Sequence, residues 1–128
     1  MEQIIAQVAQ TAGIDAETAQ KAVGTILGFL QKEGPQDAVG QLLGAMPGAE
    51  DLIAQGEGGG GGLLGAVGGM FGGAGGLMAL AGQLQGLGLG MGQMQDVGKS
   101  LFAQGRELVG EDVMGQIAGS VPGLSQFT

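Results

Sequence analysis

The stretch LLGAVGGMFGGAGGLMALA, residues 63–81, decides how the rest of this sequence is interpreted. It contains no charged side chain, and its glycines recur at intervals of four residues. Residues four apart lie on the same side of an α-helix, so a helix here would have a glycine-lined side that another helix can approach almost to backbone contact. Two interleaved rows form this side, Gly65, Gly69 and Gly73 in one and Gly68, Gly72 and Gly76 in the other. We therefore predict a glycine-zipper helix with these six glycines as its packing or self-association contacts.

The composition of the whole chain excludes several classes of function. Glycine supplies 31 of the 128 residues, whereas proteins average about 7% glycine. Twelve acidic residues against four basic ones give a net charge of −8, which offers no basic patch for nucleic acid. The absence of His and Cys removes the usual neutral-pH base, thiolate nucleophiles and the commonest metal ligands. We accordingly predict a protein that is not an enzyme, has no cofactor or metal, and does not bind nucleic acid.

The first residues, MEQIIAQVAQ, carry an acid at Glu2 and lack the basic region of a standard secretory signal. The expected location is therefore cytoplasmic. A chain of 128 residues is also long enough to bury one core, so a single domain is expected.

The first expected module, residues 1–55, consists of helices. From Ala19 to Leu30, apolar residues recur at helical spacing, and Asp15 stands where an N-cap belongs. Gly24 and Gly28 interrupt this helix at a cost of about 1 kcal/mol each relative to alanine, but they allow close packing. The expected helices cover residues 2–12, 16–32, 36–45 and 49–55, with breaks at Gly13, Gly34-Pro35 and Pro47-Gly48.

The remainder divides into three parts. Residues 56–62 form a glycine-rich linker, residues 63–92 comprise the zipper helix followed by an irregular connection, and residues 93–128 form a second helical module. Within that module we predict one helix from Gln93 to about Leu108. The next helix opens at Gly110-Glu111-Asp112 and carries the apolar residues Val113, Met114 and Ile117.

The two modules contain an internal repeat. Residues 38–48 align with residues 113–123 at an offset of 75 without a gap. The identical pairs are Gly40/Gly115, Gln41/Gln116, Gly44/Gly119, Pro47/Pro122 and Gly48/Gly123. Because repeated units bury their apolar faces against each other, we predict an all-α fold in which duplicated helix-turn-helix modules pack around the central glycine-zipper helix.

A family resemblance rests on four segments of the chain. These are GIDAETAQKAVGTILGFLQKEG, AVGQLLGAMPGAEDLI, the Gly/Leu-rich centre and DVGKSLFAQGRELVGEDVMGQIAGSVPG. Together they resemble the small bacterial domain-of-unknown-function family labelled VcgC/VcgE, over most of the chain. The resemblance implies a small, glycine-rich helical fold. It implies no activity, because the family has none established.

Three pairs of carboxylates are the available candidates for acid–base chemistry. They are Asp15/Glu17, Glu50/Asp51 and Glu111/Asp112. All three fall at predicted helix starts, where acids stabilise the helix dipole by about 0.3–1 kcal/mol. We therefore interpret them as capping residues. The glycines between Gly86 and Gly92 are likewise no phosphate loop, since no Lys-Ser/Thr directly follows Gly92 and Lys99-Ser100 lies too far on, inside a predicted helix.

Two hypotheses for function remain. The favoured one is a non-enzymatic structural or interaction protein that forms homo-oligomers through its glycine zipper. The alternative is a membrane-inserting protein, because the nineteen residues 63–81 almost reach the approximately 20 that span a bilayer. Methionines are expected to fill the core or to mark a binding groove; beyond Met1 they are Met46, Met70, Met78, Met91, Met94 and Met114.

Overall fold

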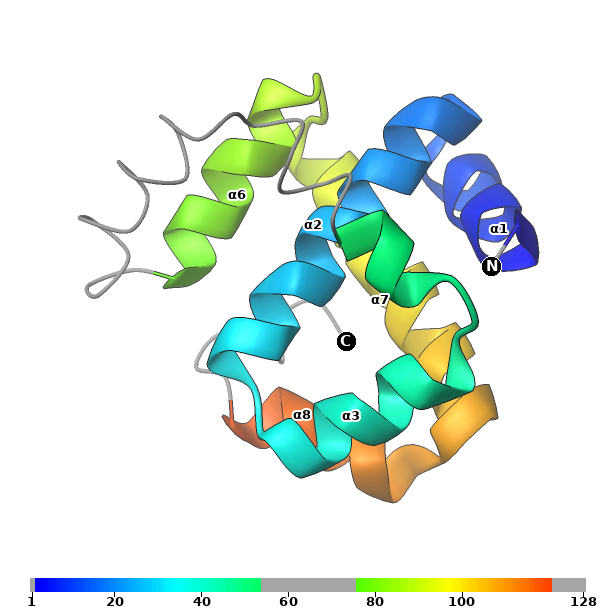
Figure 1. The fold of residues 1–128 in the computed structure, drawn as a ribbon. Helices are drawn as coiled ribbons and strands as arrows, with labels where there is room; N and C mark the ends of the chain where they lie inside the picture. The colour runs from blue at the N-terminus through cyan, green and yellow to red at the C-terminus, as the bar shows by residue number, and fades with distance from the viewer. Residues whose placement is uncertain (1, 54–75, 121–128) are drawn as a thin grey trace.

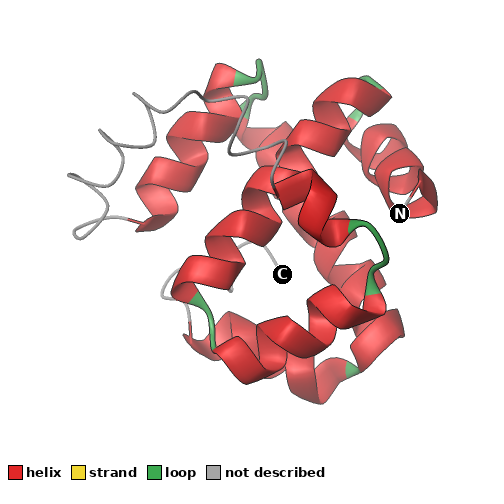
Figure 2. Ribbon diagram, viewed as in Figure 1, coloured by secondary structure: helices red, strands yellow, loops and turns green. Residues whose placement is uncertain are grey.

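In a computed structural model of the chain, which describes residues 2–53 and 76–120, the backbone is helical and these residues contain no strand (Figure 2). Within each of these two ranges, short loops connect the helices. The labelled helices are α1 (Glu2–Ala12), α2 (Ala16–Glu33), α3 (Gln36–Ala45), α6 (Gly76–Gly86), α7 (Met91–Val109) and α8 (Glu111–Ser120). Residues 49–53 add a further helical segment after α3. The all-α prediction is confirmed for this part of the chain.

The loop between α1 and α2 follows from one glycine. Gly13 has a φ of +68°, a conformation that side chains with a Cβ rarely adopt. This bend lets the Ile14 N–H donate to the Ala9 carbonyl over 2.9 Å, which satisfies a free acceptor at the end of α1. Asp15 is the N-cap residue of α2, as predicted, but its side chain accepts no capping hydrogen bond.

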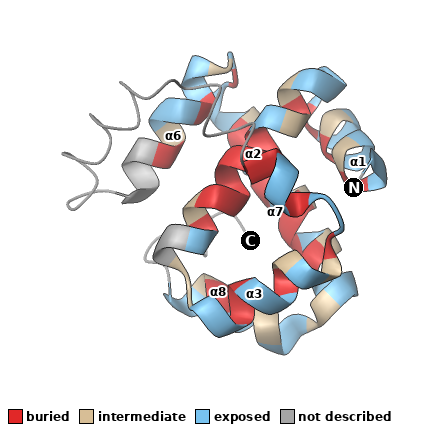
Figure 3. Ribbon diagram, in the orientation of Figure 1, coloured by how far each residue is buried: buried red, intermediate tan, exposed pale blue. Residues whose placement is uncertain are grey.

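Helix α2 lies among four of the other described helices. Residues 22–28 are all buried, and α2 contacts α1, α3, α6 and α7. Figure 1 shows α1 on one side of α2 and α6 on the other, and Figure 3 shows the buried residues concentrated on α2 and α7. The buried stretch 22–28, AVGTILG, carries no charged side chain, and a helical stretch that is uncharged on every side is typically buried in a protein core. The sequence of this stretch therefore places the middle of α2 in the core.

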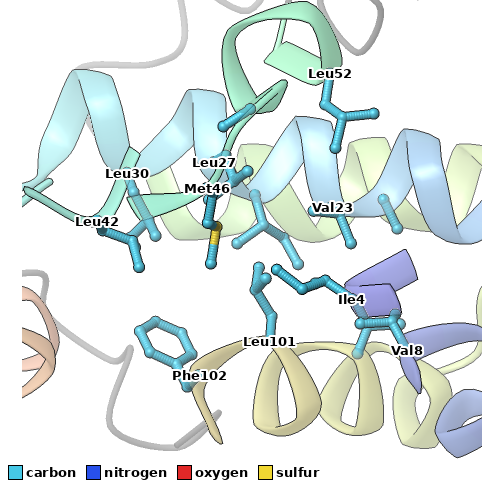
Figure 4. Close-up of a cluster of buried hydrophobic side chains, with 14 of the residues drawn as sticks. Ile4, Val8, Val23, Leu27, Leu30, Leu42, Met46, Leu52, Leu101 and Phe102 are labelled. Carbon is cyan, nitrogen blue, oxygen red and sulfur yellow. The ribbon is translucent and has the colours of Figure 1, made fainter. Parts of the chain in front are cut away.

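The core fills the space between α2 and α7. Figure 4 shows Leu101 and Phe102 of α7 pointing toward side chains of α2 and α3. The largest fully buried side chains are Phe102, Leu27, Leu30, Leu42, Met46, Leu101, Ile117, Val8, Val23, Val39 and Val97. Since full burial of one such side chain stabilises a fold by about 1.5–3 kcal/mol, this cluster is the main source of stability in the described part.

Helix α7 begins earlier than the sequence predicts. An irregular connection was expected up to residue 92, but α7 starts at Met91. Its start is stabilised locally, because the Gly90 N–H donates to Oε1 of Gln93 over 2.9 Å. A Gln three residues into a helix commonly binds the N-cap N–H in this way. The expected irregular connection is therefore short, covering only residues 87–90.

Two glutamine side chains connect α7 to α1. Nε2 of Gln93 donates to the carbonyl oxygen of Ala12 over 3.3 Å, and Nε2 of Gln104 donates to that of Ile4 over 3.4 Å. The first bond satisfies an acceptor at the C-terminus of α1, where carbonyl groups lack partners within the helix. These bonds fix how far α1 can slide along α7.

The predicted modules are described to different extents. The repeated residues 38–45 lie in α3 and residues 113–120 lie in α8, and these two helices pack against each other. The linker 56–62 and residues 63–75 of the zipper stretch lie outside the described residues. Helix α6 is the described end of that stretch, and it packs against α2.

Candidate interaction surface

The three carboxylate pairs lie at helix starts. Asp15 and Glu17 flank the start of α2, Glu50 and Asp51 are in the helical segment after α3, and Glu111 and Asp112 open α8. All six side chains are exposed to solvent. Glu17 also forms an exposed ion pair with Lys21, with Oε1 and Nζ 3.6 Å apart. The structure thus places all three pairs at the helix dipoles and none of them in an enclosed cleft.

The six zipper glycines are described only at one end. Gly76 is the first residue of α6. The other five, Gly65, Gly68, Gly69, Gly72 and Gly73, lie outside the described residues. Farther along α6, Leu80 and Leu84 are buried, whereas Gly82 is exposed and an added Cβ there would meet no atom within 4 Å. Helix α6 therefore has one side packed on the core and one open side.

One of two glycines spaced four apart in α2 forms a close backbone contact. Gly24 and Gly28 are both buried. A Cβ atom added to Gly24 would overlap the carbonyl oxygen of Leu52 and lie 2.8 Å from its carbonyl carbon. Only glycine allows the backbone of the segment 49–53 to lie this close to a helix. The expectation that Gly24 permits close packing is confirmed.

The exposed glycines of α3 and α8 were not predicted to be surface residues. Gly40 and Gly44 of α3, and Gly115 and Gly119 of α8, are exposed, and a Cβ at any of them would meet no atom within 4 Å. The internal repeat contained the signal, because the same glycines are identical between its two copies. From the sequence alone, the identical glycines were explained by the shared fold of the two copies, and their exposure to solvent was not predicted.

The methionines divide between core and surface. Met46, Met94 and Met114 are buried, as expected for adaptable core side chains. Met91 at the start of α7 is 71% exposed. Met46 also lines a groove at the turn after α3.

Two further properties bear on the kind of site. Within residues 2–53 and 76–120, no group of three or more acidic side chains is arranged to hold a metal ion. None of the helices described there combines the length and the apolar character needed to cross a bilayer.

Comparisons with known protein families, characterised proteins and solved structures gave no match to this chain. The resemblance to the VcgC/VcgE family therefore stays a prediction.

Proposed function

We propose that this protein is a non-enzymatic structural or interaction protein that self-associates through its glycine zipper. The duplicated helix-turn-helix modules would pack around the zipper helix and hold its glycine rows in position. The rows Gly65, Gly69, Gly73 and Gly68, Gly72, Gly76 would then form the contact between copies of the chain.

The observation that carries this proposal is the contact at Gly24. Gly24 and Gly28 have the same four-residue spacing as the zipper rows, and Gly24 lies against the backbone of Leu52. Each zipper row has three glycines where α2 has two. A longer row gives a longer surface for backbone approach, and small residues at a helix interface favour such association.

Charge supports contact through the zipper in particular. Copies of a chain with a net charge of −8 repel one another in solution. No charged residue occurs between Gly58 and Gln95, so the zipper stretch is the part of the chain where two copies meet with the least repulsion.

Size-exclusion chromatography with light scattering tests this proposal. We expect the unmodified chain to run as a multiple of its 12.5 kDa mass. Gly69→Leu or Gly72→Leu should shift the mass toward that of a monomer, because the added side chain prevents close approach. Gly82→Leu is the matched control, since Gly82 is exposed in α6 with open space around it.

The outcomes separate the alternatives. Unchanged mass and unchanged melting temperature in both zipper variants would contradict the proposal. Material that becomes a discrete species only in detergent would favour the membrane-inserting alternative instead.

A further inference from the structure

An open groove lies where α3 ends and the chain turns into residues 49–53. Its volume is about 450 Å³, and it is lined by residues of α2, α3 and the turn. The lining includes polar, apolar and acidic residues, among them Gln31, Gly40, Leu43, Gly44, Glu50 and Asp51.

Two exposed glycines of α3 line the groove. Gly40 and Gly44 lie on the same face of α3, and neither would bring a Cβ within 4 Å of another atom. Leu43, beside them, is half-buried and adds an apolar surface. The buried side chains of Met46 and Ala49 form part of the lining below. A partner chain can therefore approach the backbone of α3 closely, which favours a polypeptide over a compact small molecule.

The helical segment 49–53 contributes negative charge to the lining of the groove. Glu50 and Asp51 line the groove and are exposed to solvent. Of the basic side chains that the structure describes, Lys21, Lys99 and Arg106, none lines the groove. Opposite charges across an interface steer association and select partners. A second copy of this chain, with twelve acids and four bases, is a poor match for these acidic side chains.

We infer that this groove binds a Lys- or Arg-rich segment of a partner protein. The backbone or small residues of that segment lie over Gly40 and Gly44, and its cations lie against Glu50 and Asp51. None of the residues that line this groove belongs to the zipper rows, so the groove adds a partner to the self-association proposed above.

Fluorescence anisotropy with a labelled amphipathic peptide of Lys and Ala tests the inference. A length of about 15 residues gives such a peptide enough helix to occupy a helix-lined groove. We expect saturable binding, which weakens about tenfold in Gly44→Leu because leucine fills the groove. Glu50→Gln/Asp51→Asn should weaken binding by about the same factor, and this surface variant serves as the check if Gly44→Leu alters folding.

The internal repeat supplies matched controls. Gly119→Leu changes the repeat counterpart of Gly44, which is also exposed but does not line the groove. Glu111→Gln/Asp112→Asn removes the same charge from a helix start outside it. Both should alter affinity by less than about threefold.

Three results would overturn the inference. The first is absence of saturable binding. The second is equal weakening in the groove variants and their controls, which would show attraction by net charge alone. The third is equal binding of a peptide with Glu in place of Lys. Light scattering on the same variants keeps the two proposals distinguishable, because Gly44→Leu should leave the oligomeric mass unchanged while Gly69→Leu changes it.

Discussion

Helix α2 and the pair α3 and α8 use glycine in opposite ways. In α2, Gly24 is buried against the backbone of Leu52, so the glycine makes a tertiary contact possible. In α3 and α8, Gly40 and Gly115 face solvent with no atom near the position of a Cβ. The intrinsic cost to the helix is the same at each site, about 1 kcal/mol relative to alanine. Packing can offset that cost, and among these three helices the contact at Gly24 does so in α2. Glycine content by itself therefore says little about stability until the neighbour of each glycine is known.

Among the substitutions that test this difference, Gly24→Ala should change the free energy of unfolding most. The new methyl group would overlap the Leu52 carbonyl, and because the obstacle is backbone, the segment 49–53 must move away from α2. We expect the free energy of unfolding to fall by about 1–3 kcal/mol, even though alanine is the better helix former. Urea unfolding followed by helical circular dichroism measures this. Gly82→Ala, in open space on α6, is the control and should not destabilise the protein.

Gly40→Ala and Gly115→Ala should act in the opposite direction. Each adds a methyl group in open space on a helix, so each should raise the free energy of unfolding by about 0.5–1 kcal/mol. The double variant should gain about the sum, because neither methyl group meets another atom within 4 Å. The same urea titration applies, at matched protein concentration, since self-association would itself raise the apparent stability. A loss of stability in either single variant would contradict the expectation that these exposed glycines make no stabilising contact.

Gly105→Ala is the intermediate case and should have the smallest effect. A Cβ at Gly105 would lie 2.8 Å from Sδ and Cε of Met114 and 3.2 Å from Cδ1 of Leu42. These atoms end flexible side chains, so they can move at a cost of about 0.5–1.5 kcal/mol. The gain in helix propensity, about 1 kcal/mol, offsets most of this cost. We expect a change in unfolding free energy of less than about 0.5 kcal/mol in the urea titration. A loss as large as that of Gly24→Ala would show that Met114 is as rigid as backbone.

Helix boundaries could be predicted because local chemistry determines them. Gly13, the Gly34-Pro35 pair and Pro47-Gly48 end helices where the sequence indicates, and α3 spans residues 36–45 as expected. Each of these breaks depends on the φ preference of one or two residues. The early start of α7 was not predicted because it depends on a hydrogen bond that the Gln93 side chain accepts from the Gly90 N–H. Because glycine is a poor helix former, the glycine-rich residues 86–92 were expected to be irregular.

The surfaces could not be predicted, because they depend on tertiary neighbours. The sequence shows glycines four apart in α2, α3 and α8 alike. It does not show that Leu52 covers Gly24 while nothing covers Gly40. In the same way, the pair Glu50/Asp51 could be assigned to a helix start, but its place beside the face of α3 requires the turn at residues 46–48 to be known.

The hydrogen bonds from α7 to α1 have a consequence for synthesis of the chain. Gln93 and Ala12 are 81 residues apart, and Gln104 and Ile4 are 100 residues apart. At roughly 5–20 residues per second, a ribosome needs on the order of ten seconds to make the intervening residues. During that time Ile4 and Val8, which are buried in the finished fold, have no α7 to cover them. Folding that depends on such distant pairs is slow, so the side of α1 that α7 covers in the finished fold stays accessible to chaperones and to neighbouring chains until α7 has emerged.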